Sequence, residues 1–190
     1  MSSLISLTSD DHVIRAIRAD EWQAVKRLRL DALRDPVAHL AFLETYEKAA
    51  AEPDTFWQGR AERSGEGADG ARQFIAEGPD GAWVGTLTVL VEEAGSTDWA
   101  GFAVDRKQGH VVGVFMQPGY RGIGLTEALF AAGVEWAWGV GAERVRLIVH
   151  EENGRAQGFY RKVGFVPSGV TVALEQASGE SELEFVLEKS

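Results

Sequence analysis

The stretch QPGYRGIGLTEALF, residues 117–130, decides how this chain is expected to fold. It follows the apolar run HVVGVFM (110–116), which predicts a central strand covered on both faces. It leads into residues 125–139, where apolar side chains recur at helical spacing. A helix N-terminus leaves unpaired N–H groups and carries a partial positive charge, so a glycine turn between a strand and a helix is a candidate anion site.

The residues of this turn suit an anion such as a phosphate. Gly122 and Gly124 let backbone amides approach a ligand without a Cβ in the way, and Arg121 adds positive charge. The dinucleotide fingerprint G-x-G-x-x-G is absent, because Glu127 stands at its third glycine position. No Lys-Ser/Thr pair follows the glycines, which excludes a P-loop.

Composition excludes several other classes of protein. The 190 residues are 45% hydrophobic and 25% charged, which is enough for a buried core. There is no cysteine, and the four histidines lack metal-ligand spacing, so no metal is expected. The net charge of −10 opposes a nucleic acid backbone. Neither a signal peptide nor a segment of ~20 apolar residues is present, so we expect a cytoplasmic protein without membrane contact.

Periodicity and turn residues predict the other elements. A helix is expected at 20–34, with Asp20 and Gln23 as a capping box, and a shorter helix near 52–63. The long stretch 94–109 is expected to be irregular, with Trp99 and Phe102 either over a site or packed on the sheet. Strands are expected at 12–18, 72–77, 82–93, 144–150, 165–174 and 181–187, and a short helix at 153–163.

Two segments resemble the GNAT (Gcn5-related N-acetyltransferase) superfamily. Arg121, Gly124 and Thr126 stand at the key positions of its acyl-CoA loop, R/Q-x-x-G-x-G/A, although the family normally has glycine or alanine where Thr126 stands. The segment HEENGRAQGFYRKVGF (150–165) is similar to the family pattern N-x-x-A-x-x-F-Y-x-x-x-G-F. The matching residues are Asn153, Ala156, Phe159, Tyr160, Gly164 and Phe165. The stretches EWQAVKRLRLDAL and AFLETYE resemble, less specifically, acceptor-binding helices of the family.

The resemblance implies an α/β (α+β) GNAT fold: a mixed, mostly antiparallel seven-stranded sheet with about four helices, whose central strands splay to admit acyl-CoA. It implies one domain over 1–190, with a tail (1–12), an acceptor side (13–70) and an acetyl-CoA-binding core (108–165). The implied co-substrate is acetyl-CoA, without a metal. The residues implied to bind it are Val114, Phe115 and Met116 through their main chain, and Arg121, Gly122, Ile123, Gly124, Leu125, Thr126, Asn153, Phe159 and Tyr160.

The implied reaction is transfer of an acetyl group to a primary amine of a small molecule by direct attack (an acyltransferase, EC 2.3.1.-). Tyr160 is the candidate acid for the leaving thiolate, because a tyrosine with a pKa near ~10 keeps its proton at neutral pH; packing on the sheet is its alternative role. Glu151 and Glu47 are candidate bases, although a solvated surface charge is the favoured role of each. Glu152, Glu44 and His110 are further candidates for the base.

Other functions stay open at this stage. A catalytically silent acyl-CoA-binding or sensor domain would keep the loop at Arg121, and a protein-lysine or N-terminal acetyltransferase would share the chemistry. We expect a small cationic acceptor, because residues 1–119 hold 19 acidic and 12 basic residues, and 41–57 mix carboxylates with aromatic rings. Simple packing of those rings is the alternative. A homodimer is left open by the sequence.

Overall fold

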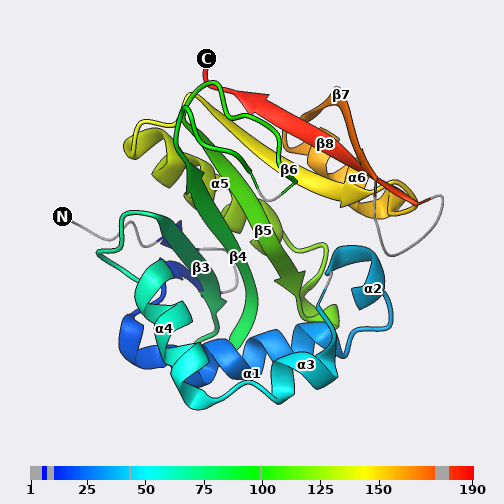
Figure 1. Ribbon diagram of the computed structural model, residues 1–190. Coiled ribbons are helices and arrows are strands. Elements are labelled where there is room, and N and C mark those ends of the chain that lie inside the picture. Colours follow the sequence, from blue (N-terminus) through cyan, green and yellow to red (C-terminus); the bar gives the residue numbers. More distant parts are fainter. Residues whose placement is uncertain (1–5, 8–10, 43, 99, 174–179) are drawn as a thin grey trace.

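The fold is one mixed sheet with helices on both faces (Figure 1). The computed structural model describes residues 6–7, 11–42, 44–98, 100–173 and 180–190. The strand order is β1-β2-β3-β4-β5-β6-β8-β7, and all neighbours are antiparallel except β5 and β6. The strands are β1 (Ser6–Leu7), β2 (Val13–Ala16), β3 (Ala71–Glu77), β4 (Trp83–Glu92), β5 (Gln108–Met116), β6 (Arg144–His150), β7 (Val166–Ala173) and β8 (Ser181–Glu188).

This architecture confirms the expected mixed, mostly antiparallel sheet. The seven longer strands are those expected, and the two-residue β1 adds an eighth within the stretch expected to be a tail. The α-helices of the described residues are α1 (Trp22–Leu33), α2 (Ala38–Ala41), α3 (Tyr46–Ala50), α4 (Asp54–Ser64), α5 (Leu125–Gly139) and α6 (Gly154–Lys162). Two of them, α2 and α3, add to the four expected. None of the helices in the described part of the chain is both long and apolar enough to span a bilayer.

Two hydrophobic cores lie on opposite faces of the sheet. On the back face, Leu125 and Leu129 of α5 pack with Val89 and Leu147 of the strands, and α6 joins this core. On the front face, α1, α3 and α4 pack around Trp57, which has no exposed surface. Apolar residues that alternate along the central strands feed both cores, which is why these strands are apolar on both faces.

The start of the first helix differs from the expected capping box. Helical structure begins with a 3-10 turn at Ala19–Glu21, directly before α1. The Glu21 carboxylate, rather than Gln23, accepts a hydrogen bond from the Arg18 backbone N–H at 2.8 Å. Glu21 also forms an ion pair of 2.7 Å with Arg15 of β2. A contact with the neighbouring strand therefore fixes the cap two residues earlier than the local pattern predicts.

The central strands β5 and β6 are paired over only part of their length. Parallel pairing runs from Gln108 with Arg144 to Val111 with Leu147 and stops there, and Figure 1 shows the two strands diverging beyond it. A β-bulge follows at once, because Thr86 and Thr88 of β4 oppose Phe115 and Val112 of β5. Gly113 sits in the bulge with φ of 63°, a left-handed conformation that glycine adopts without strain.

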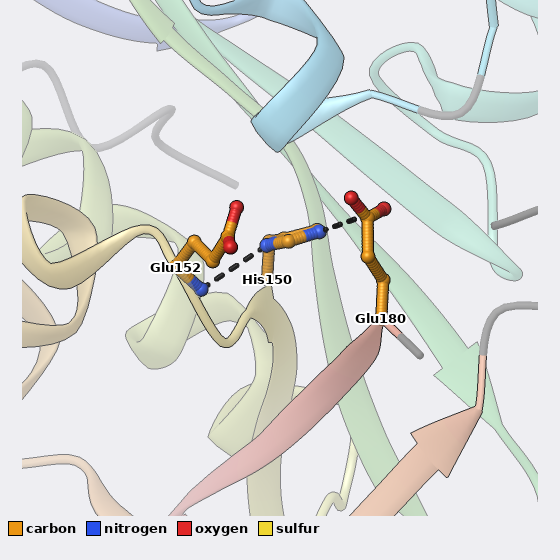
Figure 2. Close-up of side chains that lie close together, drawn as sticks. All are labelled: His150, Glu152 and Glu180. Atoms are coloured by element: carbon orange, nitrogen blue, oxygen red, sulfur yellow. Dashed lines mark hydrogen bonds and ion pairs between the residues drawn. The ribbon is translucent and has the colours of Figure 1, made fainter. Parts of the chain in front are cut away.

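The end of β6 lies at the mouth of this splay. Its last residue, His150, is buried, with its Nδ1 accepting from the Glu152 backbone N–H at 3.1 Å (Figure 2). On the other side of the ring, Nε2 lies 3.3 Å from the Glu180 carboxylate. These contacts hold the turn that leads from β6 into α6 against the start of β8.

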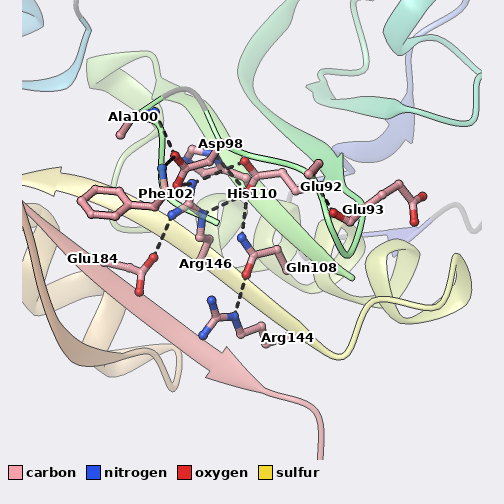
Figure 3. A network of polar contacts seen from close by, with 11 residues as sticks. Glu92, Glu93, Asp98, Ala100, Phe102, Gln108, His110, Arg144, Arg146 and Glu184 are labelled. Atoms are coloured by element: carbon pink, nitrogen blue, oxygen red, sulfur yellow. Dashed lines mark hydrogen bonds and ion pairs between the residues drawn. The ribbon is translucent and has the colours of Figure 1, made fainter. Parts of the chain in front are cut away.

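The long connection between β4 and β5 is fastened to the front of the sheet by a buried ionic network (Figure 3). Arg146 of β6 contacts Glu92 at 3.0 Å, Asp98 at 2.8 Å and Glu184 at 2.8 Å. Asp98 also accepts hydrogen bonds from the backbone N–H groups of Ala100 and Phe102. One guanidinium therefore joins the connection to β4, β6 and β8.

The same network perturbs the Glu92 carboxyl. Burial alone would raise the pKa of Glu92, but nearby His110 and Arg146, together with a hydrogen bond from Gln108, lower it to about 2. The Nδ1 of His110 lies 3.8 Å from Glu92, beyond the range of a hydrogen bond. The Glu92 carboxylate stays ionised at neutral pH and holds Arg146 in place.

We expect Arg146→Met to destabilise the fold by about 3–5 kcal/mol, because it leaves buried carboxylates without their cation. The measurement is the free energy of unfolding from urea titration at neutral pH. Arg106→Met is the matched control, because Arg106 pairs with Glu188 at the surface and should cost less than about 1 kcal/mol. Equal effects of the two substitutions would contradict a central role for the network.

Candidate active site

The glycine turn before α5 forms an open cradle of backbone. Gly122 and Gly124 have φ values of 78° and 95°, in the left-handed region. A Cβ at either position would meet no atom within 4 Å, so the space above them is free. Gly124 is the N-cap of α5 and offers no side chain, so no side-chain cap occupies the first-turn amides. Leu125 is buried, Thr126 is half-buried and Ile123 is exposed at the rim.

Arg121 fastens this turn to the rest of the fold. Its guanidinium donates to the Met116 carbonyl at 2.9 Å and forms an ion pair with Asp35 at 2.7 Å. Burial would raise the pKa of Asp35, but the hydrogen bond and charge of Arg121, a hydrogen bond from the Val37 N–H and the charge of Arg155 lower it. The positive charge of Arg121 is therefore neutralised by Asp35, which lies 86 positions away in the sequence.

A second ion pair borders the cradle. Glu127, in the first turn of α5, contacts Lys162 of α6 at 3.0 Å. Burial would raise the pKa of Glu127, but its own backbone N–H and Lys162 lower it. Because both bordering cations are paired, the backbone amides at the start of α5 are the donors that this geometry offers to an anion.

The edge of β5 that faces the splay connects the cradle to the interior. Pairing with β6 ends at Val111, so Val114, Phe115 and Met116 have no strand beside them on that edge. Their side chains pack elsewhere: Phe115 joins the front core, whereas Val114 and Met116 join the back core. This is the ordinary alternation of side chains along a strand, and the backbone along the edge is left to pair with an extended ligand.

Tyr160 of α6 lies in an aromatic cluster on the back face. Its ring centroid is 5.7 Å from that of Phe130, 6.3 Å from Phe185 and 6.4 Å from Phe165. Phe159 packs beside it at 5.9 Å. Burial raises the pKa of the Tyr160 hydroxyl to about 12, so the group holds its proton firmly. Packing and proton donation are compatible here, because the ring fixes the position of the hydroxyl.

Asn153 has the structural role that its residue type favours. Its Oδ1 accepts a hydrogen bond from the Ala156 backbone N–H at 3.2 Å and so caps α6. This cap sets the direction of the helix that carries Phe159 and Tyr160. A contact of Asn153 with the cofactor stays a prediction.

The residues predicted as bases are spread over the molecule. Glu151 is exposed and accepts from the Ser181 backbone N–H at 3.1 Å. Glu47 is exposed on α3, which lies far from α6 in Figure 1. Glu44 forms an ion pair with Arg29, and His110 is buried in the paired part of β5. The structure therefore does not gather these groups around Tyr160.

His150 is a residue that sequence reasoning passed over. With Glu152 and Glu180 it forms a group whose potential ligand atoms lie within 4.8 Å of one another. Both ring nitrogens already have partners, so a metal would have to displace them. The signal that could have found it is its position as the last residue of a central strand, directly before the helix that carries Tyr160.

The aromatic rings of the acceptor side are already engaged. The Arg29 guanidinium lies 4.5 Å from the centroid of Phe42, and that of Arg34 lies 4.5 Å from Tyr46. Phe56 packs edge-on against the buried Trp57. Phe102 is 47% exposed on the β4–β5 connection, and Trp99 lies outside the described residues.

A hollow of about 500 Å³ lies beside the cradle. It is lined by α1, the β3–β4 turn and the segment 117–120. None of the predicted site residues lines it. The splay and the cradle are defined instead by main-chain geometry, so we do not place the chemistry in this hollow.

Comparison with known proteins agrees with this geometry. The acetyltransferase (GNAT) family model matches residues 22–165. A Bacillus subtilis (strain 168) protein, provisionally named a ribosomal protein bS18-alanine N-acetyltransferase, is 30% identical over 95 residues, which are 50% of this chain and 63% of that relative. The chain thus spans less than two thirds of the curated relatives that it matches.

Solved structures show the same fold. A GNAT-family acetyltransferase from Streptococcus pneumoniae superposes with a TM-score of 0.72 at 16% identity, over 94% of this chain and 99% of that chain. Nourseothricin acetyltransferase is 28% identical with a TM-score of 0.51, over 62% of this chain and 65% of that chain. With the splayed strands, the uncapped helix start and a family match over three quarters of its length, this chain belongs to the acetyltransferase (GNAT) family.

Proposed function

We propose that this protein transfers the acetyl group of acetyl-CoA to a primary amine of a small molecule by direct attack. The observation that carries the proposal is the end of β5–β6 pairing at Val111, which leaves a backbone edge leading to the uncapped start of α5. An extended arm with a diphosphate at one end matches this pair of features. Family membership supports the transfer of an acyl group.

In this proposal the cofactor is held mainly by main chain. The edge at Val114, Phe115 and Met116 pairs with the pantetheine arm, and the amides from Gly122 to Thr126 receive the pyrophosphate. The free space above both glycines supports this assignment, because a side chain at either position would fill it. Arg121, held by Asp35, positions the turn rather than supplying an unpaired charge.

The proposed reaction uses the chain's own groups for proton transfer. The amine nitrogen forms a bond to the acetyl carbonyl carbon, and the carbon–sulfur bond breaks. Tyr160 gives its proton to the departing sulfur and regains one from solvent. The amine loses its proton to water or to a carboxylate, for which Glu151 and Glu47 stay the predicted candidates. The raised pKa of Tyr160 keeps this acid protonated at neutral pH.

The names of the relatives point to two different classes of acceptor. Nourseothricin acetyltransferase is named for a small molecule, whereas the Bacillus subtilis relative is named for a ribosomal protein. We favour a small molecule, because α1, α3, α4 and the β4–β5 connection cover parts of the front face. Of the two carboxylates expected to hold a cationic acceptor, Glu44 already pairs with Arg29, whereas Glu47 is exposed on α3.

A screen for release of free CoA thiol tests the function. Acetyl-CoA is supplied with amines, amino acids, aminoglycosides and peptides with free N-termini. We expect turnover of at least one small amine well above hydrolysis without acceptor. Turnover of peptides alone would replace the acceptor class with proteins, and binding of acetyl-CoA without any turnover would favour a sensor domain.

We expect Gly124→Asp to abolish the increase in melting temperature that acetyl-CoA gives, because it puts a negative charge in the cradle. Gly124→Asn is the matched control, because asparagine has the shape of aspartate, is strained in the same way at a φ of 95° and is neutral. It should keep most of the shift. An unchanged shift in a folded Gly124→Asp variant would rule out the cradle as the phosphate site.

We expect Tyr160→Phe to lower kcat about 100-fold and to leave the affinity for acetyl-CoA nearly unchanged, because the hydroxyl is needed only as the sulfur becomes anionic. Steady-state kinetics and calorimetry measure the two quantities. Tyr120→Phe, at a partly exposed tyrosine near the cradle, controls for the loss of a hydroxyl elsewhere. Full turnover of the Tyr160 variant would remove this residue from the mechanism.

A further inference from the structure

Two arginines approach the front face of the sheet beside the β5 bulge. Arg29 comes from α1 and Arg60 from α4. The Arg29 guanidinium pairs with Glu44 at 2.9 Å, but its Nε is buried without a hydrogen-bond partner. A Cβ at Gly113 would lie 3.9 Å from its Nη1, so this guanidinium borders the point where β5 and β6 separate.

Arg60 has no carboxylate of its own. No ion pair joins it to an acid anywhere in the described part of the chain. Burial and then the positive charge of Arg29 lower the pKa of Arg60 to about 10, against the opposing charge of Glu44. Two cations thus share the single carboxylate of Glu44. Both arginines are partly exposed, and Arg60 lies over the Trp57 ring at 5.7 Å, so this surplus of positive charge is accessible to an anionic ligand.

A small cavity lies between the two arginines and the sheet. It measures about 20 Å³ and is lined by Val25, Arg29, Arg60, Gln73, Thr88 and Gly113. This space admits only the end group of a ligand, and such a group would lie next to the bulge.

We propose that Arg29 and Arg60 bind a carboxylate of the acceptor, so that the substrate is a small amine that also carries a carboxylate, such as an amino acid. This inference rests on the proposed function, since it places the acceptor beside the splay. Guanidinium groups form paired hydrogen bonds with a planar carboxylate, and the small cavity suits that group better than a bulkier phosphate. The carboxylate fills the unmet donor of Arg29 and supplies the acid that Arg60 lacks.

The test compares amino acids with their carboxamides, which differ in charge but hardly in shape. For the best acceptor we expect wild-type kcat/KM to be at least about tenfold higher for the free acid than for the carboxamide. A factor of this size corresponds to the loss of one hydrogen bond to a charged group. In Arg60→Gln this ratio should fall to near one. The matched control is Arg63→Gln, at an exposed arginine of the same helix, which should keep the ratio.

A second measurement separates this inference from the proposed function. N-acetylated amino acids and N-acetylated amino acid amides are titrated into the protein by calorimetry, which needs no turnover. Binding of the acids that is lost in Arg60→Gln but kept in Arg63→Gln supports the carboxylate site even if no acetyl transfer is found. The carboxylate site would be overturned if the wild type used or bound the acid and the carboxamide equally well. It would also be overturned if Arg60→Gln and Arg63→Gln changed this preference equally.

Discussion

The parallel pairing of β5 with β6 ends after four residues, and the rest of the site depends on where it ends. Two constraints stop it there: the bulge at Gly113 turns β5 away, and the ionic network at Arg146 holds β6 against β8 and the β4–β5 connection. Backbone groups inside a protein need partners, so a sheet keeps an open internal edge only where a ligand or water completes it. The bulge in β5 and the ionic network at β6 thus hold the opening from its two sides.

Charge is distributed very differently at three places around this opening. At the cradle, the charges of Arg121 and Lys162 are neutralised by Asp35 and Glu127. The backbone amides at the start of α5 are then the groups that bind an anion in our proposal. At Arg146, three carboxylates surround one guanidinium. Because the pKa of Glu92 is lowered on folding, its stabilisation is complete above the ordinary value of 4.5 and is lost as the pH falls toward about 2. At Arg29 and Arg60, two guanidinium groups face the single carboxylate of Glu44.

Much of the fold was predictable from the sequence, because alternation in the strands and helical spacing in 125–139 are local signals. The cradle was predictable for the same reason: strand, glycine turn and helix adjoin in the chain. Contacts between distant residues were not predictable. The pairing of Arg121 with Asp35 and of Arg29 with Glu44 is an example, since a count of charges does not say which are already neutralised. The cap at Glu21 differed because a strand residue, Arg15, takes part.

The acidic balance of the whole chain and a carboxylate site at Arg60 are compatible because they act over different ranges. At physiological ionic strength, exposed charges more than about 8 Å apart are largely screened, so the net charge of −10 is a weak guide to the groups that contact a ligand. A zwitterionic amino acid has no net charge, and the field of the chain neither attracts nor repels it strongly. Close to the bulge the two guanidinium groups then orient it, with the carboxylate toward them and the amine free to face the splay. Local pairing, rather than overall charge, decides which amine this site would accept.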